Sequence, residues 1–326
     1  MTHGISRRDA LKLSAAVVAA ALAPAALAQN DGTLRLVVTF PPGGSTDITA
    51  RILQPKLAER IGRPVVVENR PGAASQVGTQ FVARAAPDGN TVLVSFDTHA
   101  INPIARKTLP YDTFKDFVGV SLAVRFPLVI AASSAVPGKD LKEFLAAARL
   151  APGKFSYAST GVGSMNHLVA EDLQRQAAAE LLHVPYGGGG PAVAAVLGNT
   201  VSLTLLSYAA LKSNIAAGKI KALAVTGTKR LADLPDVPTV AESGFPGFEA
   251  YSWIGIFAPA ATPPATVKKL SEDFQAALNS PEVSGKLTDS GFEVMATDGP
   301  TLDRYARDQY QRWDAFVKRT NLKVEE

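Results

Sequence analysis

The chain has 326 residues, of which 47% are hydrophobic, and its formal net charge is +4. It contains no cysteine, which excludes disulfide bonds, thiolate catalysis and cysteine metal sites. No block of like charges stands out, so no nucleic-acid surface is expected, and the length predicts about two domains.

The N-terminal segment Met1–Ala28 is expected to be a cleaved export signal, which predicts a periplasmic protein. It carries the pair Arg7 and Arg8, then the alanine-rich apolar run Ala15–Leu22, and it ends in an A-x-A cleavage pattern. The arginine pair indicates a twin-arginine signal. Because Ala10 stands where such signals usually have a large apolar residue, Sec export is the alternative.

The first element after the signal is an apolar strand, Leu34–Thr39, that leads into two prolines and two glycines. Ser45, Thr46 and Asp47 then begin a helix. This order places free backbone N–H groups at the positive end of the helix, where an anion can bind without lysine or arginine. We interpret Asp47 as complementing the helix dipole and tying down the loop, not as a catalytic group.

From residue 34 onward, β-like runs alternate with amphipathic helical stretches. The runs are Leu34–Thr39, Val65–Glu68, Thr91–Ser95, Phe155–Ser159, Leu182–Val184, Val201–Leu206 and Ala222–Thr226. The expected helices are Ile48–Arg60, Val77–Ala86, Leu141–Ala148, Leu168–Gln176 and Ala209–Ala217. The alternation predicts an α/β protein with mainly parallel sheets, covered by helices on both faces.

Two longer apolar runs, Ala123–Ala132 and Tyr251–Pro259, interrupt this alternation and are interpreted as extended crossovers between two lobes. The first lobe would then comprise residues 30–126 plus 250–326, and the second 127–249. Two sequential domains are the alternative. The tail is expected to be helical, without strands, and to pack on the first lobe. Its predicted helices, each beginning at a proline, are Pro264–Leu278, Pro281–Asp289 and Pro300–Leu322.

A second glycine- and hydroxyl-rich loop, Thr160–Ser164, follows the predicted strand Phe155–Ser159 and precedes a helix that begins near Met165. Either loop alone is equally well explained as a capped turn. Two such loops in different lobes, both at the carboxyl ends of parallel strands, favour a ligand cleft between the lobes.

Signals for catalysis, metals and cofactors are absent from the sequence pattern. There is no G-x-S-x-G elbow and no phosphate-binding G-x-x-x-x-G-K-[ST] motif. His99, His167 and His183 lie far apart without metal-ligand spacing, so each is interpreted as structural. The run Gly187–Gly190 is interpreted as a flexible loop before a helix. We therefore expect no catalytic residue, metal site or cofactor.

Several segments, taken together and in this order, resemble the Bug-type extracytoplasmic solute receptors of tripartite tricarboxylate transporters. They are FPPGGSTDITAR (40–51), PVVVENRPGA (64–73), VARAAPDGNTVL (82–93), THAINP (98–103), LPYDTFKDF (109–117), YASTGVGSMNHL (157–168), HVPYGGGGPA (183–192) and LPDVPTVAESGFPGFE (234–249). The resemblance covers essentially the whole chain after the signal segment.

The resemblance implies a two-lobed type II periplasmic-binding-protein fold that closes over a small organic acid. It also implies delivery of this carboxylate by a monomer to the membrane subunits of a tripartite tricarboxylate transporter. The ligand-binding positions that it implies are Phe40, Pro42, Gly43, Gly44, Ser45, Thr46, Asp47, Thr98, Ser159, Thr160, Gly161, Gly163, Ser164, Pro185, Tyr186 and Ser207.

The chain departs from the family pattern on the far wall of the expected cleft. Where relatives often carry a V-D-L-M-F-D pattern, Val201–Leu206 has no acidic residue, and Gly187 follows the H-V-P-Y motif in place of a polar residue. We therefore expect plain or aromatic carboxylic acids to bind better than amino acids. A receptor that signals through a sensor kinase is the alternative function. A secreted α/β hydrolase is a third hypothesis, which the missing elbow argues against.

Overall fold

The computed structural model describes residues 32–324, so the predicted export signal lies outside the described residues. Its strands are β1 (Leu34–Val38), β2 (Val65–Asn69), β3 (Thr91–Phe96), β4 (Phe117–Ser133), β5 (Phe155–Ser159), β6 (Leu181–Pro185), β7 (Leu203–Ser207), β8 (Ile220–Val225), β9 (Tyr251–Pro259) and β10 (Glu293–Val294). Its helices are α2 (Ser45–Ile61), α3 (Gln76–Ala83), α4 (Thr98–Ala105), α5 (Leu141–Leu150), α6 (Met165–Gln176), α7 (Gly189–Leu197), α8 (Tyr208–Ala216), α9 (Pro264–Leu278), α10 (Pro281–Asp289) and α11 (Gly299–Thr320).

The strands form one mixed sheet in the order β2-β1-β3-β9-β4-β7-β5-β6, with β8 and β10 also pairing with β4. The long strand β4 divides this sheet. Residues 117–127 of β4 pair with β9, and residues 128–133 pair with β7 and β8. We call β1–β3, β9, β10 and the first part of β4 the first half, and β5–β8 with the remainder of β4 the second half.

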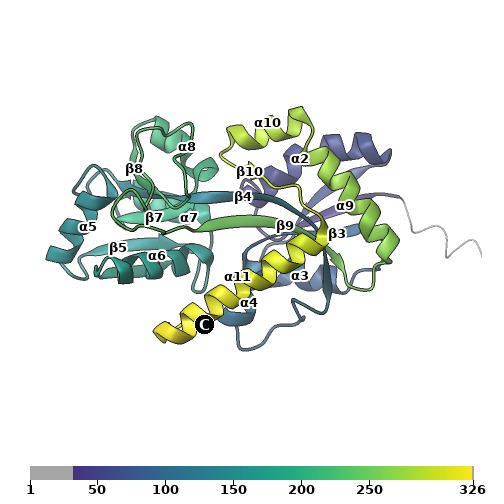
Figure 1. Cartoon of the computed structure of the whole chain (residues 1–326), viewed down its shortest axis with the longest axis horizontal. Helices are drawn as coiled ribbons and strands as arrows, with labels where there is room; N and C mark the ends of the chain where they lie inside the picture. The colour runs from purple at the N-terminus through teal and green to yellow at the C-terminus, as the bar shows by residue number, and fades with distance from the viewer. Residues whose placement is uncertain (1–31, 325–326) are drawn as a thin grey trace, which may run out of the picture. The chain divides into compact units, whose positions relative to one another are not determined.

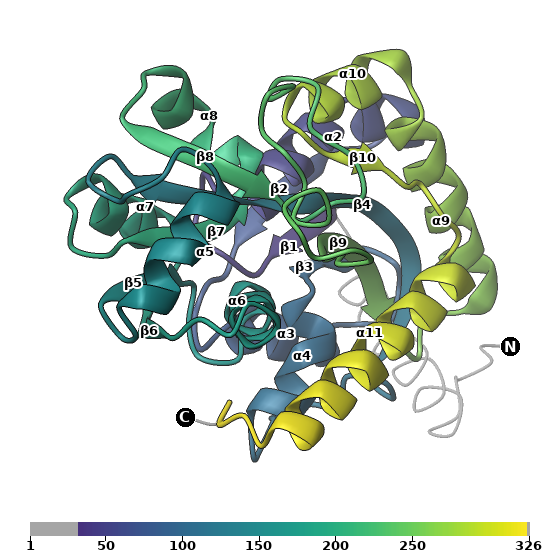
Figure 2. The same cartoon turned by 60° about the vertical axis from the view of Figure 1, so that its left-hand side comes forward.

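Helices cover both halves (Figure 1). In the first half, α2 packs on β1 and β2, and α9 packs on α2 and β4. In the second half, α6 packs on β5 and β7, and α7 and α8 pack on β4 and β7. The last helix, α11, lies along β4 and α4 (Figure 2). Among the described residues, no helix combines the length and apolar character that a membrane crossing needs.

Local sequence explains where several helices begin and end. Asp140 caps α5 by accepting a hydrogen bond from the Glu143 N–H at 2.9 Å, and Asp298 does the same for α11 through Thr301 at 2.9 Å. Gly62 ends α2 in the left-handed conformation, with a φ of 67°. These caps fix the helix ends, while the strands supply the continuous apolar core.

Three expectations about the elements are wrong. The tail does contain a strand, because β10 pairs antiparallel with Val124 and Arg125 of β4. The sheet is mixed and not mainly parallel where β9 pairs antiparallel with β3 and β4, and where β4 pairs antiparallel with β7 and β8. The glycine run is not all loop, because α7 begins at Gly189 within it.

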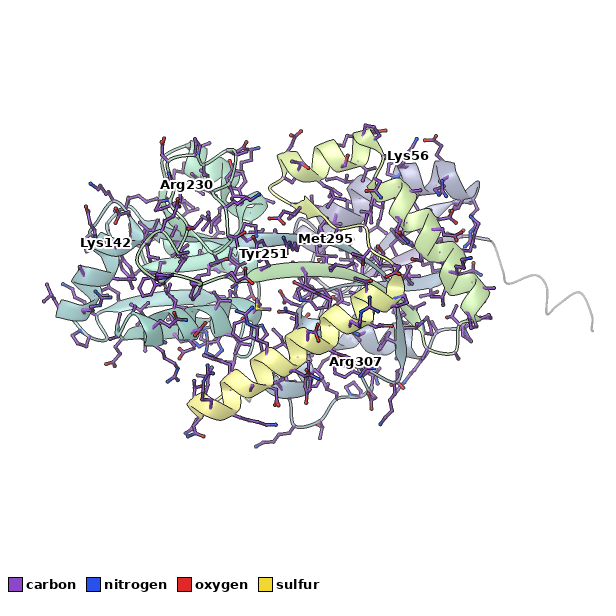
Figure 3. The ribbon with its side chains drawn as sticks, in the orientation of Figure 1. Lys56, Lys142, Arg230, Tyr251, Met295 and Arg307 are labelled. Carbon is purple, nitrogen blue, oxygen red and sulfur yellow. The ribbon has the colours of Figure 1, made fainter. Side chains whose placement is uncertain are left out.

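The chain passes between the two halves close to Thr226, which is fully buried. Its hydroxyl accepts from the Leu128 N–H at 2.8 Å and donates to the Ala250 carbonyl at 2.6 Å. Tyr251, labelled in Figure 3, begins β9 at the same place and accepts from the Thr228 N–H at 3.0 Å. One buried threonine thus joins the three chain segments at the junction of the halves.

Candidate functional site

The first predicted loop lies at the carboxyl end of β1 and begins α2. Gly44 is the N-cap, with φ −80° and ψ 168°, and Ser45, Thr46 and Asp47 are buried in the first turn of the helix. Pro42 and Gly43 are exposed, and the ring of Phe40, before them, packs edge-on against Phe96 with 5.1 Å between centroids. Among the described residues, the hydroxyl of Thr46 is buried without a hydrogen-bond partner.

Asp47 holds this loop in place through three neighbours. Its carboxylate accepts from the Gly43 N–H at 2.9 Å, from Arg51 Nε at 2.9 and 3.0 Å, and from Asn69 Nδ2 at 2.9 Å. Asn69 also donates to the Phe40 carbonyl at 3.0 Å. Burial alone would raise the pKa of Asp47, but the hydrogen bonds from Arg51, Gly43 and Asn69 outweigh it and lower the pKa. Asp47 is therefore an ionised structural brace.

The second predicted loop lies at the carboxyl end of β5 and is braced by neutral groups. Ser164 Oγ donates to the Gly161 carbonyl at 2.6 Å, and Ser159 Oγ donates to the same carbonyl at 3.0 Å. The N–H of Thr160 donates to Asn166 Oδ1 at 3.3 Å, and the N–H of Gly163 donates to Nδ1 of His167 at 3.1 Å. The amides of Gly163 and, in the first loop, Gly43 are thus engaged within the protein.

The two halves meet at the predicted site. Ser45, at the start of α2, and Ser207, at the end of β7, share a hydrogen bond of 2.9 Å between their Oγ atoms, and both are buried. Asn166, in the first turn of α6, donates from Nδ2 to the carbonyl of Leu205 in β7 at 3.1 Å. The N-termini of α2, α6 and α8 are thereby brought together.

The second loop also packs directly against the first half. A Cβ built on Gly163 would lie 2.4 Å from the Cβ of Ala105 at the end of α4, and 3.1 Å from the Val324 carbonyl oxygen. Gly163 has a φ of +72°, which favours glycine as well. Close packing and backbone conformation therefore both require glycine at this position.

The remaining predicted site residues lie at the edges of this arrangement. Thr98 begins α4 at the carboxyl end of β3, and its Oγ1 accepts from Ser75 Oγ at 3.3 Å. Tyr186 is half-buried after β6 and donates its N–H to the Ser159 carbonyl at 3.0 Å, while Pro185 is exposed. No hydrogen bond within residues 32–324 joins these three to Ser45 or Ser207.

Sequence reasoning did not find the left-handed segment Ala73–Ser75 beside this site. Its φ angles are 45°, 50° and 76°, a conformation that side chains other than glycine rarely adopt. It places Ser75 Oγ within hydrogen-bond distance of Thr98 and of Asn102 Nδ2, the latter at 3.3 Å. Nothing in the local composition signals this conformation, since the segment carries no glycine after Gly72.

The structure also brings together two histidines that the sequence separates. The rings of His167 and His183 stack with their centroids 4.0 Å apart, directly behind the second loop. Sequence spacing did not indicate this contact, because it depends on the parallel pairing of β5 and β6 that places His183 opposite Tyr157. Among the described residues, no group of three or more His, Cys, Asp or Glu side chains is arranged to hold a metal ion.

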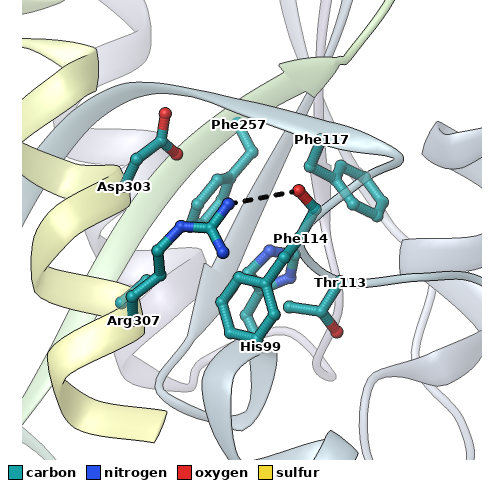
Figure 4. Close-up of a pocket in the computed structure, with 8 residues that line it drawn as sticks. His99, Thr113, Phe114, Phe117, Phe257, Asp303 and Arg307 are labelled. Atoms are coloured by element: carbon teal, nitrogen blue, oxygen red, sulfur yellow. Dashed lines mark hydrogen bonds between the residues drawn. The ribbon is translucent and has the colours of Figure 1, made fainter. Parts of the chain in front are cut away.

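A small cavity of about 30 Å³ lies apart from this site, beneath α11 (Figure 4). It is lined by His99, Thr113 and Asp303, and Arg307 Nη2 donates to the Phe114 carbonyl at its edge at 3.4 Å. Burial lowers the pKa of His99 to about 3, so the imidazole is neutral. The volume accommodates a water molecule and is too small for an organic acid.

Comparison with known proteins gives consistent matches over most of the chain. The family model for the tripartite tricarboxylate transporter family receptor matches residues 49–322. BugT of Bordetella pertussis is 35% identical over 294 residues, which cover 89% of this chain and 90% of BugT. Among solved structures, R. palustris Rpa4515 with adipate has 31% identity and a TM-score of 0.86, over 90% of this chain and 98% of that one. MatC from Rhodopseudomonas palustris with bound malate has 32% identity and a TM-score of 0.78, over 87% and 98%.

Proposed function

Because the chain belongs to the tripartite tricarboxylate transporter receptor family, we propose that it binds a small carboxylate where α2, α6 and α8 begin. We further propose that it delivers this ligand to a membrane transporter of the tripartite tricarboxylate type. Members of this family are periplasmic solute receptors and not enzymes. The observation that carries the proposal is the Ser45–Ser207 contact of 2.9 Å between the two halves.

Helix N-termini provide the electrostatic reason for a carboxylate. Gly44, Ser164 and Ser207 cap α2, α6 and α8, so the positive ends of these helices face a common place. The caps offer hydroxyl and backbone donors, and the residues predicted to bind the ligand include neither lysine nor arginine. A carboxylate fits such a group of neutral donors, with ordered water as a further bridge.

The junction of the halves supports a closing movement. Within residues 32–324, the chain passes from the first half to the second along β4 and returns through the segment that runs from Thr226 to the start of β9. We propose lobes of residues 30–126 plus 250–326 and of residues 127–249, which close about Thr226. A ligand that contacts both loops would stabilise the closed state by its greater affinity for that state.

Two observations support a proposal for the class of ligand: the ligands in similar solved structures and the composition of strand β7. The similar structures named above contain adipate in one case and malate in the other. In this chain β7 reads LTLLS, so the wall that ends at Ser207 carries no acidic group to pair with an amine. We propose that adipate and malate bind and that aspartate and glutamate bind more weakly.

Calorimetric titration of the protein lacking residues 1–28 tests this proposal. Adipate and malate should bind, and each should raise the melting temperature, because a ligand at 100 times its Kd adds about 2.7 kcal/mol of stability. Ser207→Ala should weaken binding, whereas Ser284→Ala, on α10 away from the site, is the matched control and should not. Binding of aspartate or glutamate alone would overturn the proposed ligand class.

A further inference from the structure

A stack of aromatic side chains supports the second loop from inside the second half. The His183 ring, on β6, lies between Tyr157 on β5, with centroids 4.9 Å apart, and His167 on α6, with centroids 4.0 Å apart. The interplanar angles are 18° and 11°, so the three rings are nearly parallel. Tyr157 is fully buried and His167 is 3% exposed. Tyr157 and His167 are therefore interior residues, and the half-buried His183, on the edge strand β6, lies between them beneath residues 159–164.

Each histidine holds one end of the loop. Nε2 of His183 lies 2.6 Å from Oγ of Ser159, and Nδ1 of His167 lies 3.1 Å from the backbone nitrogen of Gly163. A backbone N–H can only donate, so Nδ1 of His167 must be the acceptor. The geometry thus requires a neutral His167 whose proton is on Nε2.

The surroundings give the stack no compensating negative charge. Strands β5, β6 and β7 carry no acidic residue. On α6 the facing groups are Glu171 and Arg175. Glu171 accepts from the Tyr157 hydroxyl at 2.9 Å, and it pairs with Arg175 at 3.6 Å. Among the described residues, no carboxylate therefore contacts either imidazole.

Burial accordingly disfavours the protonated imidazoles. It lowers the pKa of His183 to about 4, and burial together with the neighbouring His183 lowers the pKa of His167 to about 3. A proton on Nδ1 of His167 would face the Gly163 N–H, and a second charge would lie on the ring stacked 4.0 Å away. The first effect removes the acceptor of the Gly163 N–H, and the second adds repulsion between the two stacked rings.

We propose that His167 and His183 are positioning residues that hold the second loop in its ligand-binding conformation, and that the contact of His167 with the Gly163 N–H holds only while the His167 imidazole is neutral. This inference rests on the proposed function, in which residues 159–164 contact the carboxylate. It goes beyond that function by assigning a role to two side chains that do not touch the ligand. Protonation of the protein would then promote ligand release in acid, in addition to the weaker binding that protonation of the ligand itself causes.

Two replacements of His167 distinguish the role of its hydrogen-bond acceptor from the role of its ring. Asn places Oδ1 near the position of Nδ1 and cannot titrate, whereas Leu fills the space without an acceptor. With adipate and malate as probes at pH 7, His167→Leu should weaken binding roughly 10- to 100-fold, because it leaves the buried Gly163 N–H unpaired. His167→Asn should stay within about threefold of the unmodified protein. Equal affinity of both variants would overturn the proposal.

The acid response tests the pair directly. The unmodified protein should lose more affinity between pH 7 and pH 3 than the double variant His167→Asn with His183→Gln, in which ligand protonation is the same. Glu171→Gln, on the same helix, keeps an acceptor for Tyr157 and is the control that should retain the full acid response. An identical pH profile for the unmodified protein and the double variant would contradict the proposal.

A ligand-free measurement keeps the inference separate from the proposed function. In protein with 15N-labelled histidine and glycine, the spectra should show His167 unprotonated at Nδ1, with a Gly163 amide protected from exchange until pH falls toward 3. A protonated Nδ1 at pH 7, or an unprotected amide, would overturn the inference. Failure of adipate and malate to bind, with these spectra as expected, would contradict only the proposed function.

Discussion

The two loops at the site occupy the same position on their strands, but they are braced in different ways. The first loop is tied to an ionised carboxylate, Asp47, which three neighbours contact. The second loop is tied to neutral groups, Asn166, His167 and His183. Because the first loop needs an ionised carboxylate and the second needs a neutral His167, acid acts on the two loops through different groups.

The signs of the pH effects follow from this difference. The pKa of Asp47 is lowered from 3.8 in the folded state, so its contribution to stability is complete above 3.8 and is lost only as pH falls through the folded value. The folded pKa values of His167 and His183 lie below 6.5. Their contribution is complete above 6.5 and is lost as pH falls toward 3 and 4. As pH falls, the stability that the histidines contribute should therefore begin to decline at a higher pH than the stability that Asp47 contributes.

The largest expected effect comes from the glycines of the two loops. Gly163→Ala should destabilise the protein by about 3 kcal/mol, because φ is +72° and the new Cβ would lie 2.4 Å from that of Ala105. Gly44→Ala should cost less than about 0.5 kcal/mol, since φ is −80° and the nearest atom, the Pro41 oxygen, is 3.6 Å from the new Cβ. Urea unfolding measures both, and equal costs would refute the proposed difference in packing.

Removal of the charged brace should have the next largest effect. Asp47→Ala leaves the Gly43 N–H and Asn69 without their acceptor and should cost about 2 kcal/mol, with weaker binding of adipate. Arg51→Ala is the matched control and should cost much less, because 51% of the Arg51 side chain is exposed. If the two variants lose the same stability, the ion pair and not the loop contact is the source of the brace.

The sequence predicted most elements of this fold because its periodicity is strong. The helices Pro264–Leu278 and Pro281–Asp289 match in both bounds, and the strand Phe155–Ser159 does as well. Family membership and the α/β class are likewise confirmed. Strand direction was predicted less well, because a run buried on both faces, such as Tyr251–Pro259, has the same composition in either direction.

The sequence could not predict contacts between residues that lie far apart along the chain, and this limited how much of the site could be predicted. Helix N-termini and their caps are local, so Ser45 and Ser164 could be placed from the sequence alone. The contact between Ser45 and Ser207 spans 162 positions, and the stack of His167 on His183 depends on how β5, β6 and α6 pack. No spacing rule connects such residues, because their proximity is a property of the sheet order.

The interiors of the two halves also differ, because the first half buries a carboxyl group where the second half buries histidines. Asp97, in the first half, is buried. Its carboxyl group accepts hydrogen bonds from Ser252 Oγ and from the Thr98 N–H. Burial raises its pKa from 3.8 to about 7. Its contribution to stability is therefore complete below 3.8 and is lost as pH rises to 7, the opposite of the histidines.

Asp97→Asn removes this titration while keeping an acceptor for Ser252. Its stability relative to the unmodified protein should rise by about 2 kcal/mol between pH 5 and pH 8. Thermal melts across that range measure the difference, and the histidines cancel because both proteins contain them. A difference that does not change with pH would mean that Asp97 is ionised throughout.

The smallest expected effect concerns the hydrogen bond between the halves. Ser45→Ala, Ser207→Ala and the double variant form a cycle whose coupling energy should be about 1 kcal/mol, the usual net value for one neutral hydrogen bond. The proposed closure also predicts that this coupling energy depends on whether a ligand is bound. If the serines meet only in the closed state, the coupling should be present in the adipate complex and should shrink in free protein. Equal coupling with and without adipate would indicate that the halves are held together at all times, and the ligand would then bind without closing them.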